Sequence, residues 1–116
     1  MEKLNIPKFD PPLNVLAVDD DATNLLVIEK MLKPYGCMVE KAASGQEALN
    51  KVWKKLPDVI LLDVMMPGMD GFEVCRNLKG KQSTRLVPII IVTALQEKED
   101  RIKGIQAGCD DFISKP

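Results

Sequence analysis

The chain has 116 residues, of which 46% are hydrophobic and 28% are charged, and it carries a formal net charge of −1. These values are typical of one soluble globular domain without a nucleic-acid or membrane partner, and no apolar run approaches the roughly 20 residues that span a bilayer. The sequence contains no histidine, which excludes histidine-based catalysis and histidine-ligated metals within this chain, so any histidine chemistry must come from a partner.

The N-terminal part of the chain predicts a leader, one strand and one helix. Residues 1–12 contain three prolines and show no hydrophobic period, so we interpret them as a leader or linker and place the domain at 13–116. Leu13–Val18 is an apolar strand that runs into three consecutive aspartates at 19–21. Apolar residues then recur every three or four positions between Ala22 and Tyr35, which predicts an amphipathic helix.

The next segment predicts an edge strand and a second helix. Cys37–Ala42 includes two charged residues, so it is not a strand buried on both faces. Ser44 and Glu47 have the spacing of a capping box, which predicts a helix start at this point. The inward face of that helix is expected to carry four apolar residues: Ala48, Leu49, Val52 and Leu56.

The most informative stretch is Val59–Leu62, four apolar residues that run directly into Asp63. A continuous apolar run of this kind is typical of a strand covered on both faces in a parallel sheet. Proline and glycine then predict a loop at 67–71. Asp63 is therefore expected at the carboxyl end of a buried strand, where open α/β sheets place their ligands.

The remaining elements continue the alternation of strand and helix. A third helix follows the loop, and 87–93 is a second fully apolar strand. A weakly apolar helix is predicted over 97–107, with Ile102 and Ile105 as its main anchors in the core. A short strand at 110–113 completes the set.

Five strands alternating with four helices predict an α/β fold with helices on both faces of a parallel sheet. The first, third and fourth strands are apolar throughout, whereas the second and fifth carry charges. Buried central strands with polar edges favour the doubly wound, flavodoxin-like order 2-1-3-4-5. A final helix expected beside the last strand is absent from these residues, so we expect either that the chain belongs to a longer protein or that this helix lies elsewhere.

The three cysteines are widely spaced and form no CxxC pair: Cys37, Cys75 and Cys109. This pattern indicates reduced thiols rather than a disulfide framework or a zinc site. No signal-peptide pattern opens the chain, and we therefore expect a cytoplasmic protein.

Five polar residues fall at the carboxyl ends of the predicted strands, namely Asp19, Asp20, Asp63, Thr93 and Lys115. In the order 2-1-3-4-5 they converge on one crevice, where the three carboxylates would repel one another without a cation. Hard oxygen ligands suit Mg²⁺, and a carboxylate can act as a nucleophile toward phosphorus. Asp63 is the best acceptor because it is central, with Thr93 and Lys115 placed to hold phosphoryl oxygens.

The pattern VLAVDDD, VILLDVMMPGMDG, PIIIVTA and DDFISKP resembles the receiver (CheY-like) domain of bacterial two-component response regulators over residues 13–116. This resemblance implies that Asp63 is the phosphoacceptor, and that Asp19, Asp20, Asp63 and the Met65 carbonyl hold Mg²⁺. It implies that Thr93 and Phe112 are switch residues. It also implies a cis peptide between Lys115 and Pro116.

The resemblance also implies partners and a signalling role without turnover of an external substrate. A histidine kinase or histidine phosphotransfer protein would donate the phosphoryl group, and the surface of the fourth helix and fifth strand would carry the response. A fused or separate output domain would read it. The segments VDDDATNLLVIEKML and TALQEKEDRIKGIQAGCDDFISKP are similar to those of receivers fused to cyclic-di-GMP enzymes or to hybrid kinases. A homodimer is a further candidate assembly.

Each of these residues also has an ordinary structural explanation, and two other functions remain open at this point. The aspartates at 19–21 could be nothing more than the N-terminus of a helix, Thr93 could be a β-branched residue that ends a strand, and Lys115 could be a solvated charge. A haloacid-dehalogenase-like phosphatase uses similar groups, but two positions after Asp63 this chain has Met65 instead of a second acid. An FMN carrier is disfavoured because consecutive aspartates would repel a bare phosphate.

Overall fold

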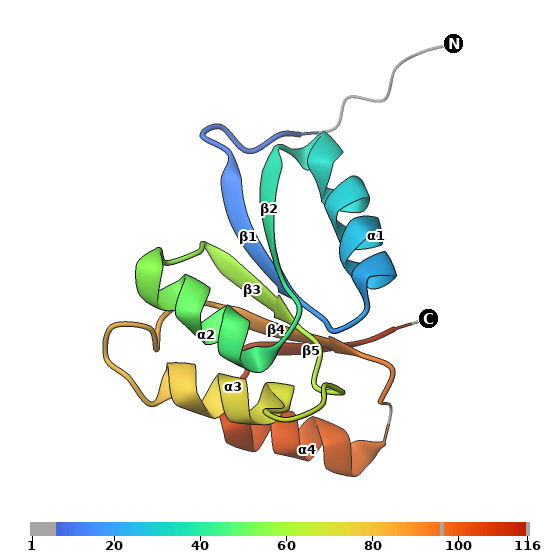
Figure 1. Cartoon of the computed structure of the whole chain (residues 1–116), viewed down its shortest axis with the longest axis vertical. Coiled ribbons are helices and arrows are strands. Elements are labelled where there is room, and N and C mark those ends of the chain that lie inside the picture. The colour runs from blue at the N-terminus through green and yellow to red at the C-terminus, as the bar shows by residue number, and fades with distance from the viewer. Residues whose placement is uncertain (1–6, 96, 116) are drawn as a thin grey trace.

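The computed structural model describes residues 7–95 and 97–115, and within them five strands form one parallel sheet (Figure 1). The order β2-β1-β3-β4-β5 is the predicted one. The strands are β1 Leu13–Val18, β2 Cys37–Ala42, β3 Val59–Leu62, β4 Ile89–Thr93 and β5 Asp111–Ser114. All neighbouring strands are parallel, so their carboxyl ends lie at the same edge of the sheet.

Helices cover both faces of the sheet, as the strand pattern predicts. They are α1 Ala22–Leu32, α2 Gly45–Lys54, α3 Gly71–Lys79 and α4 Lys98–Ala107, with a short 3-10 turn, η1 Lys33–Tyr35, after α1. Figure 1 shows α2, α3 and α4 together on one face and α1 on the other. No helix in the described ranges is both long and apolar enough to cross a membrane.

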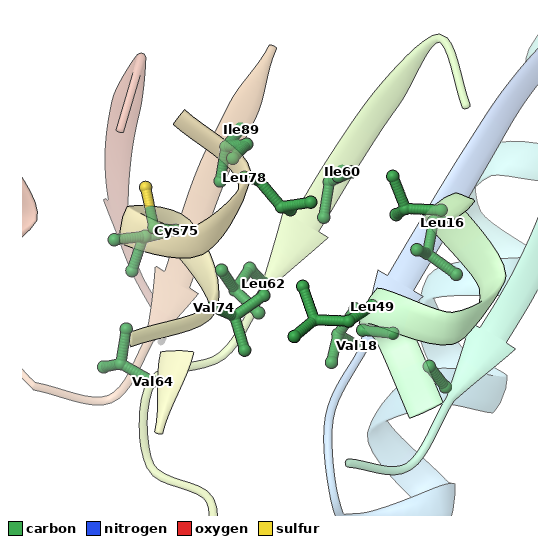
Figure 2. Close-up of a cluster of buried hydrophobic side chains, with 14 of the residues drawn as sticks. Leu16, Val18, Leu49, Ile60, Leu62, Val64, Val74, Cys75, Leu78 and Ile89 are labelled. Atoms are coloured by element: carbon green, nitrogen blue, oxygen red, sulfur yellow. The ribbon is translucent and has the colours of Figure 1, made fainter. Parts of the chain in front are cut away.

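The main core lies between the sheet and the helices α2 and α3 (Figure 2). Ile60 and Leu62 of β3 are fully buried there, and they pack in one cluster with Val74 and Leu78 of α3. The alternate residues of β3 and β4 face the side of α1 and are only half-buried. At the β5 end of that side Ile113 is 46% exposed.

Side-chain caps start the first three helices close behind the strand ends. Asp21, Ser44 and Asp70 each accept a hydrogen bond from a backbone N–H in the first turn of α1, α2 and α3. Such caps satisfy N–H groups that have no partner within the helix. The predicted helix start at Ser44 is confirmed, with 3.1 Å between its Oγ and the nitrogen of Glu47.

Three predictions about helices are wrong in detail. Ile102 and Ile105 do not anchor α4, because 43% and 71% of their surfaces are exposed. The helix instead packs through the small residues Gly104 and Ala107, which allow its backbone to approach the sheet closely. Leu56 lies beyond the end of α2 and is exposed, and Tyr35 lies in η1 and is exposed as well.

Residues 7–12 form neither helix nor strand and are exposed. One backbone hydrogen bond of 2.9 Å joins the N–H of Phe9 to the carbonyl of Tyr35. The division into a leader at 1–12 and a domain at 13–116 stays a prediction, and half of that leader lies outside the described residues. The same holds for the cis peptide before Pro116, which also lies outside the described residues.

Candidate functional site

Three carboxylates meet where β1 and β3 end side by side. The N–H of Asp63 donates to the carbonyl of Val18 (2.9 Å), so the parallel pairing continues to the first residue after β3. One carboxylate oxygen from each of Asp19, Asp20 and Asp63 lies within 4.8 Å of the other two. Asp19 and Asp63 are buried, whereas Asp20 faces solvent.

Lys115 joins the two buried acids. Its Nζ lies 2.8 Å from Asp19 Oδ2 and 2.9 Å from Asp63 Oδ2. The backbone N–H of Lys115 donates to the carbonyl of Thr93 (2.7 Å), so the lysine is held as a continuation of β5 beside β4. The lysine that could have been a solvated charge is therefore part of the acidic site.

The electrostatics of the site favour the ionised forms of Asp19 and Lys115. Burial on its own raises the pKa of Asp19, but hydrogen bonds from Lys115 and from the N–H of Asp21 more than offset this, and the pKa lies below its ordinary value. Burial likewise lowers the pKa of Lys115, but its contacts with Asp19 and Asp63 reverse the effect and raise it. The lysine therefore stays protonated between two carboxylates.

The oxygen atoms gathered here fit a hard divalent cation. Mg²⁺ prefers carboxylate, carbonyl and water oxygens, and it commonly binds through only one or two protein carboxylates. The exposed Asp20 leaves the acidic cluster open to solvent on one side. Asp19, Asp20 and Asp63 can thus hold Mg²⁺ while water or a phosphate oxygen completes its coordination.

Thr93 and Met65 border the acids. Thr93 ends β4 and is fully buried, and its Oγ1 accepts a hydrogen bond from the N–H of Leu95 (3.3 Å). Met65 donates its N–H to Asp63 Oδ1 (3.0 Å), while its side chain is 53% exposed. Thr93 is thus the last residue of β4, and Met65 follows the end of β3 in the loop after Asp63.

Comparison with known proteins shows to which family the chain belongs. The sequence model of the family described as "Response regulator receiver domain" matches residues 15–116. The chain belongs to the response regulator receiver domain family. The receiver domain is a signalling domain, and the acidic cluster of this receiver fits Mg²⁺ binding.

Relatives and solved structures agree with this assignment. The chain is 47% identical over 102 residues to the response regulator PleD of Caulobacter vibrioides, covering 88% of this chain and 22% of PleD. It is 44% identical over 108 residues to hybrid signal transduction histidine kinase L of Dictyostelium discoideum, covering 88% and 6%. The structure of chemotaxis protein CheY4 of Vibrio cholerae matches with a TM-score of 0.85 at 35% identity, covering 90% and 88%.

The receiver domain spans less than half the length of these two curated relatives. None of the comparisons supports a haloacid-dehalogenase-like phosphatase.

Phe112 lies on the same face of the sheet as Thr93. The register of β4 and β5 pairs Phe112 with Ile91 and Ser114 with Thr93. The ring is half-buried against α4, since a Cβ at Gly104 would lie 3.0 Å from its Cδ2. In this receiver domain the aromatic ring therefore fills the space left by a residue without a side chain.

Two residues contribute to the site beyond those that the sequence predicts. Asn24, in the first turn of α1, donates its side-chain amide to Asp19 Oδ2 (3.2 Å). Gly71, the first residue of α3, lies so close to the loop after β3 that a Cβ there would contact the Asp63 carbonyl and lie 2.6 Å from Val64 Cα. The sequence could have indicated Asn24, because it is a polar residue in the first turn of the helix that follows the aspartates. The close approach of Gly71 depends on tertiary structure and leaves no such signal.

Proposed function

We propose that Asp63 accepts a phosphoryl group from a phosphohistidine of a histidine kinase or histidine phosphotransfer protein, with Mg²⁺ bound. The observation that carries this proposal is the contact of Lys115 Nζ with both Asp19 and Asp63, 2.8 and 2.9 Å away, beside a third carboxylate. Such a site places an ammonium group against the carboxylate of Asp63 and gathers oxygen ligands for a cation beside it. A carboxylate of this kind is a competent nucleophile toward phosphorus.

The reaction forms one bond and breaks another. A carboxylate oxygen of Asp63 attacks the phosphorus, an O–P bond forms, and the N–P bond to the donor imidazole breaks with its electron pair returning to that nitrogen. Lys115 then neutralises an oxygen of the transferred group, and the Thr93 hydroxyl donates a hydrogen bond to another. Positioning and charge neutralisation dominate catalysis of such transfers.

The proposed metal ligands are Asp19, Asp20, Asp63 and the backbone carbonyl of Met65. Bound Mg²⁺ would supply positive charge to the phosphoryl oxygens and orient them toward the acceptor. Asn24 supports this set by fixing the carboxylate of Asp19.

We further propose that phosphorylation changes the surface of α4 and β5. Thr93 and Phe112 are the proposed switch residues, and both lie on one face of the sheet: Phe112 pairs with Ile91, and Thr93 pairs with Ser114 two positions further along the register. The packing of α4 through Gly104 and Ala107 contains little apolar surface, which suits an element with two arrangements of similar free energy. A fused or separate output domain would read the change, as the names of a response regulator and a hybrid kinase among the relatives suggest.

The test is phosphorylation by acetyl phosphate in the presence of Mg²⁺, followed by intact-protein mass spectrometry. We expect the parent chain and the control Asp111→Asn to gain one phosphoryl group, because Asp111 is an exposed acid of β5 outside the acidic cluster. We expect Asp63→Asn to gain none, and EDTA to abolish labelling of the parent. Labelling of Asp63→Asn at the parental rate would reject Asp63 as the acceptor.

A further inference from the structure

The outer edge of β2 presents unpaired peptide groups. The carbonyls of Gly36 and Ala42 accept hydrogen bonds from β1, so the even-numbered residues of β2 direct their peptide groups toward β1. The odd-numbered residues Cys37, Val39 and Lys41 therefore direct theirs away from the sheet. Lys51 Nζ donates to the carbonyl of Lys41 (2.5 Å), but no hydrogen bond within the described ranges occupies the peptide groups of Cys37 or Val39.

A cleft flanks this edge on each face of the sheet. On the side of α2, a cleft of about 210 Å³ is lined by residues that include Leu16, Met38 and Leu56. On the side of α1, a more open cleft of about 460 Å³ is lined by residues that include Leu26 and Val39. Met38, Leu56 and Leu26 are 61%, 52% and 45% exposed, so apolar surface is available on both faces.

The rims of both clefts are basic. Lysines outnumber glutamates by six to three along α1, η1, β2, α2 and the residue that follows α2, although the whole chain carries a net charge of −1. The α1 cleft is lined by Lys30 and Lys33 against one glutamate, Glu29, and the α2 cleft is lined by Lys51 and Lys55 against one glutamate, Glu40. An acidic partner is thus attracted to this edge, whereas a second copy of the same basic edge is repelled.

The charged residues of β2 itself do not block the edge. Charged side chains often protect an edge strand from pairing with another chain. Here Lys41 bonds to Glu29 of α1 (3.1 Å) and Glu40 lies 3.6 Å from Lys51 of α2, so both side chains are drawn over the faces of the sheet.

We propose that the β2 edge binds an extended, acidic segment of a partner protein as a sixth strand. Main-chain hydrogen bonds to Cys37 and Val39 supply affinity, and successive side chains of the added strand enter the two clefts alternately. The segment therefore carries consecutive apolar residues flanked by aspartate or glutamate. This surface lies away from the proposed phosphoryl-acceptor site, and the proposal stands whether or not Asp63 is phosphorylated.

The probe is the acidic peptide EDVLVIDE with blocked termini, and EDVPVPDE is the matched control that cannot pair as a strand. Amide hydrogen exchange of the 116-residue chain, followed by NMR, is measured with each peptide. We expect EDVLVIDE to slow exchange at Cys37 and Val39 while leaving Met38 unchanged, and EDVPVPDE to slow neither. Unchanged exchange at Cys37 and Val39 in a chain saturated with EDVLVIDE, or no binding at all, would overturn the proposal.

Charge reversal provides the second measurement, by fluorescence anisotropy with labelled EDVLVIDE. Lys33→Glu combined with Lys55→Glu is expected to weaken binding about tenfold, because both lysines line the clefts. Lys98→Glu combined with Lys103→Glu changes the net charge equally on α4 and is expected to change the affinity less than about twofold. If both double substitutions weaken binding of the peptide equally, the attraction is non-specific and the proposal is overturned. Dimerisation of the chain through β2 would show that a second copy is the occupant, and this outcome also overturns the proposal.

Discussion

Replacing Lys115 with methionine removes the positive charge from the acidic site and keeps an unbranched side chain that is one heavy atom shorter. The substitution leaves the carboxylates of Asp19 and Asp63 buried, 3% and 8% exposed, without the ammonium group that both contact. Removing one partner of a buried ion pair costs about 3–5 kcal/mol. Since 21% of the Lys115 side chain is exposed, water offsets part of this loss, and we expect the free energy of unfolding to fall by about 2–4 kcal/mol.

The assay is urea denaturation followed by circular dichroism, first in EDTA and then with Mg²⁺. Added Mg²⁺ supplies positive charge to the same carboxylates, so the deficit of Lys115→Met should shrink to about half or less. Lys98→Met is the control, because Lys98 is an exposed lysine at the start of α4, and it should change stability by no more than about 0.5 kcal/mol in either buffer.

Two results would refute this reasoning. A loss below about 1 kcal/mol for Lys115→Met in EDTA would mean that the buried carboxylates do not depend on the lysine. A deficit that Mg²⁺ leaves unchanged would mean that the cation does not bind where Lys115 acts.

Three further substitutions test neighbouring features. Gly71→Ala places a Cβ 2.6 Å from a backbone atom of the loop after β3, so it should destabilise the chain by about 1–3 kcal/mol in urea denaturation; parental stability would contradict the close approach. Asn24→Ala removes the hydrogen bond to Asp19 and should weaken Mg²⁺ binding roughly tenfold by calorimetry, with equal affinity counting against a supporting role. Burial raises the pKa of Asp110, but hydrogen bonds from Lys79 and from the N–H of Ile89 in β4 lower the pKa overall. The ionised Asp110 therefore stabilises the folded chain fully above the ordinary pKa of 3.8, and this stabilisation is lost as pH falls through the lower pKa of the folded state. Asp110→Asn should therefore be up to about 1 kcal/mol less stable than the parent near pH 6 and close to it near pH 2, and a constant gap would reject the pKa shift.

The sheet could be predicted because its signals are local. Val59–Leu62 is apolar without interruption, and the charged residues of Cys37–Ala42 indicate an edge, so strand polarity together with the alternation of strands and helices favours the observed order. The convergence of Asp19, Asp63 and Lys115 then follows from the parallel arrangement, since the carboxyl ends of all strands lie at one edge.

The features that sequence could not predict depend on how closely two elements approach. Ile102 and Ile105 have the right character for core anchors, but α4 is rotated so that Gly104 meets Phe112 and the isoleucines face outward. The tight contact of Gly71 has the same origin. A glycine in a sequence indicates a flexible backbone position. Only the folded structure shows whether a neighbouring element packs into the space that a side chain would occupy.

Lys115 and Asp19 touch although 96 positions separate them in the chain. A nascent chain that ends before β5 has Asp19 and Asp63 but lacks the ammonium group that both contact. Contact between this lysine and Asp19 therefore requires β1 and β5 both to be in place in the sheet.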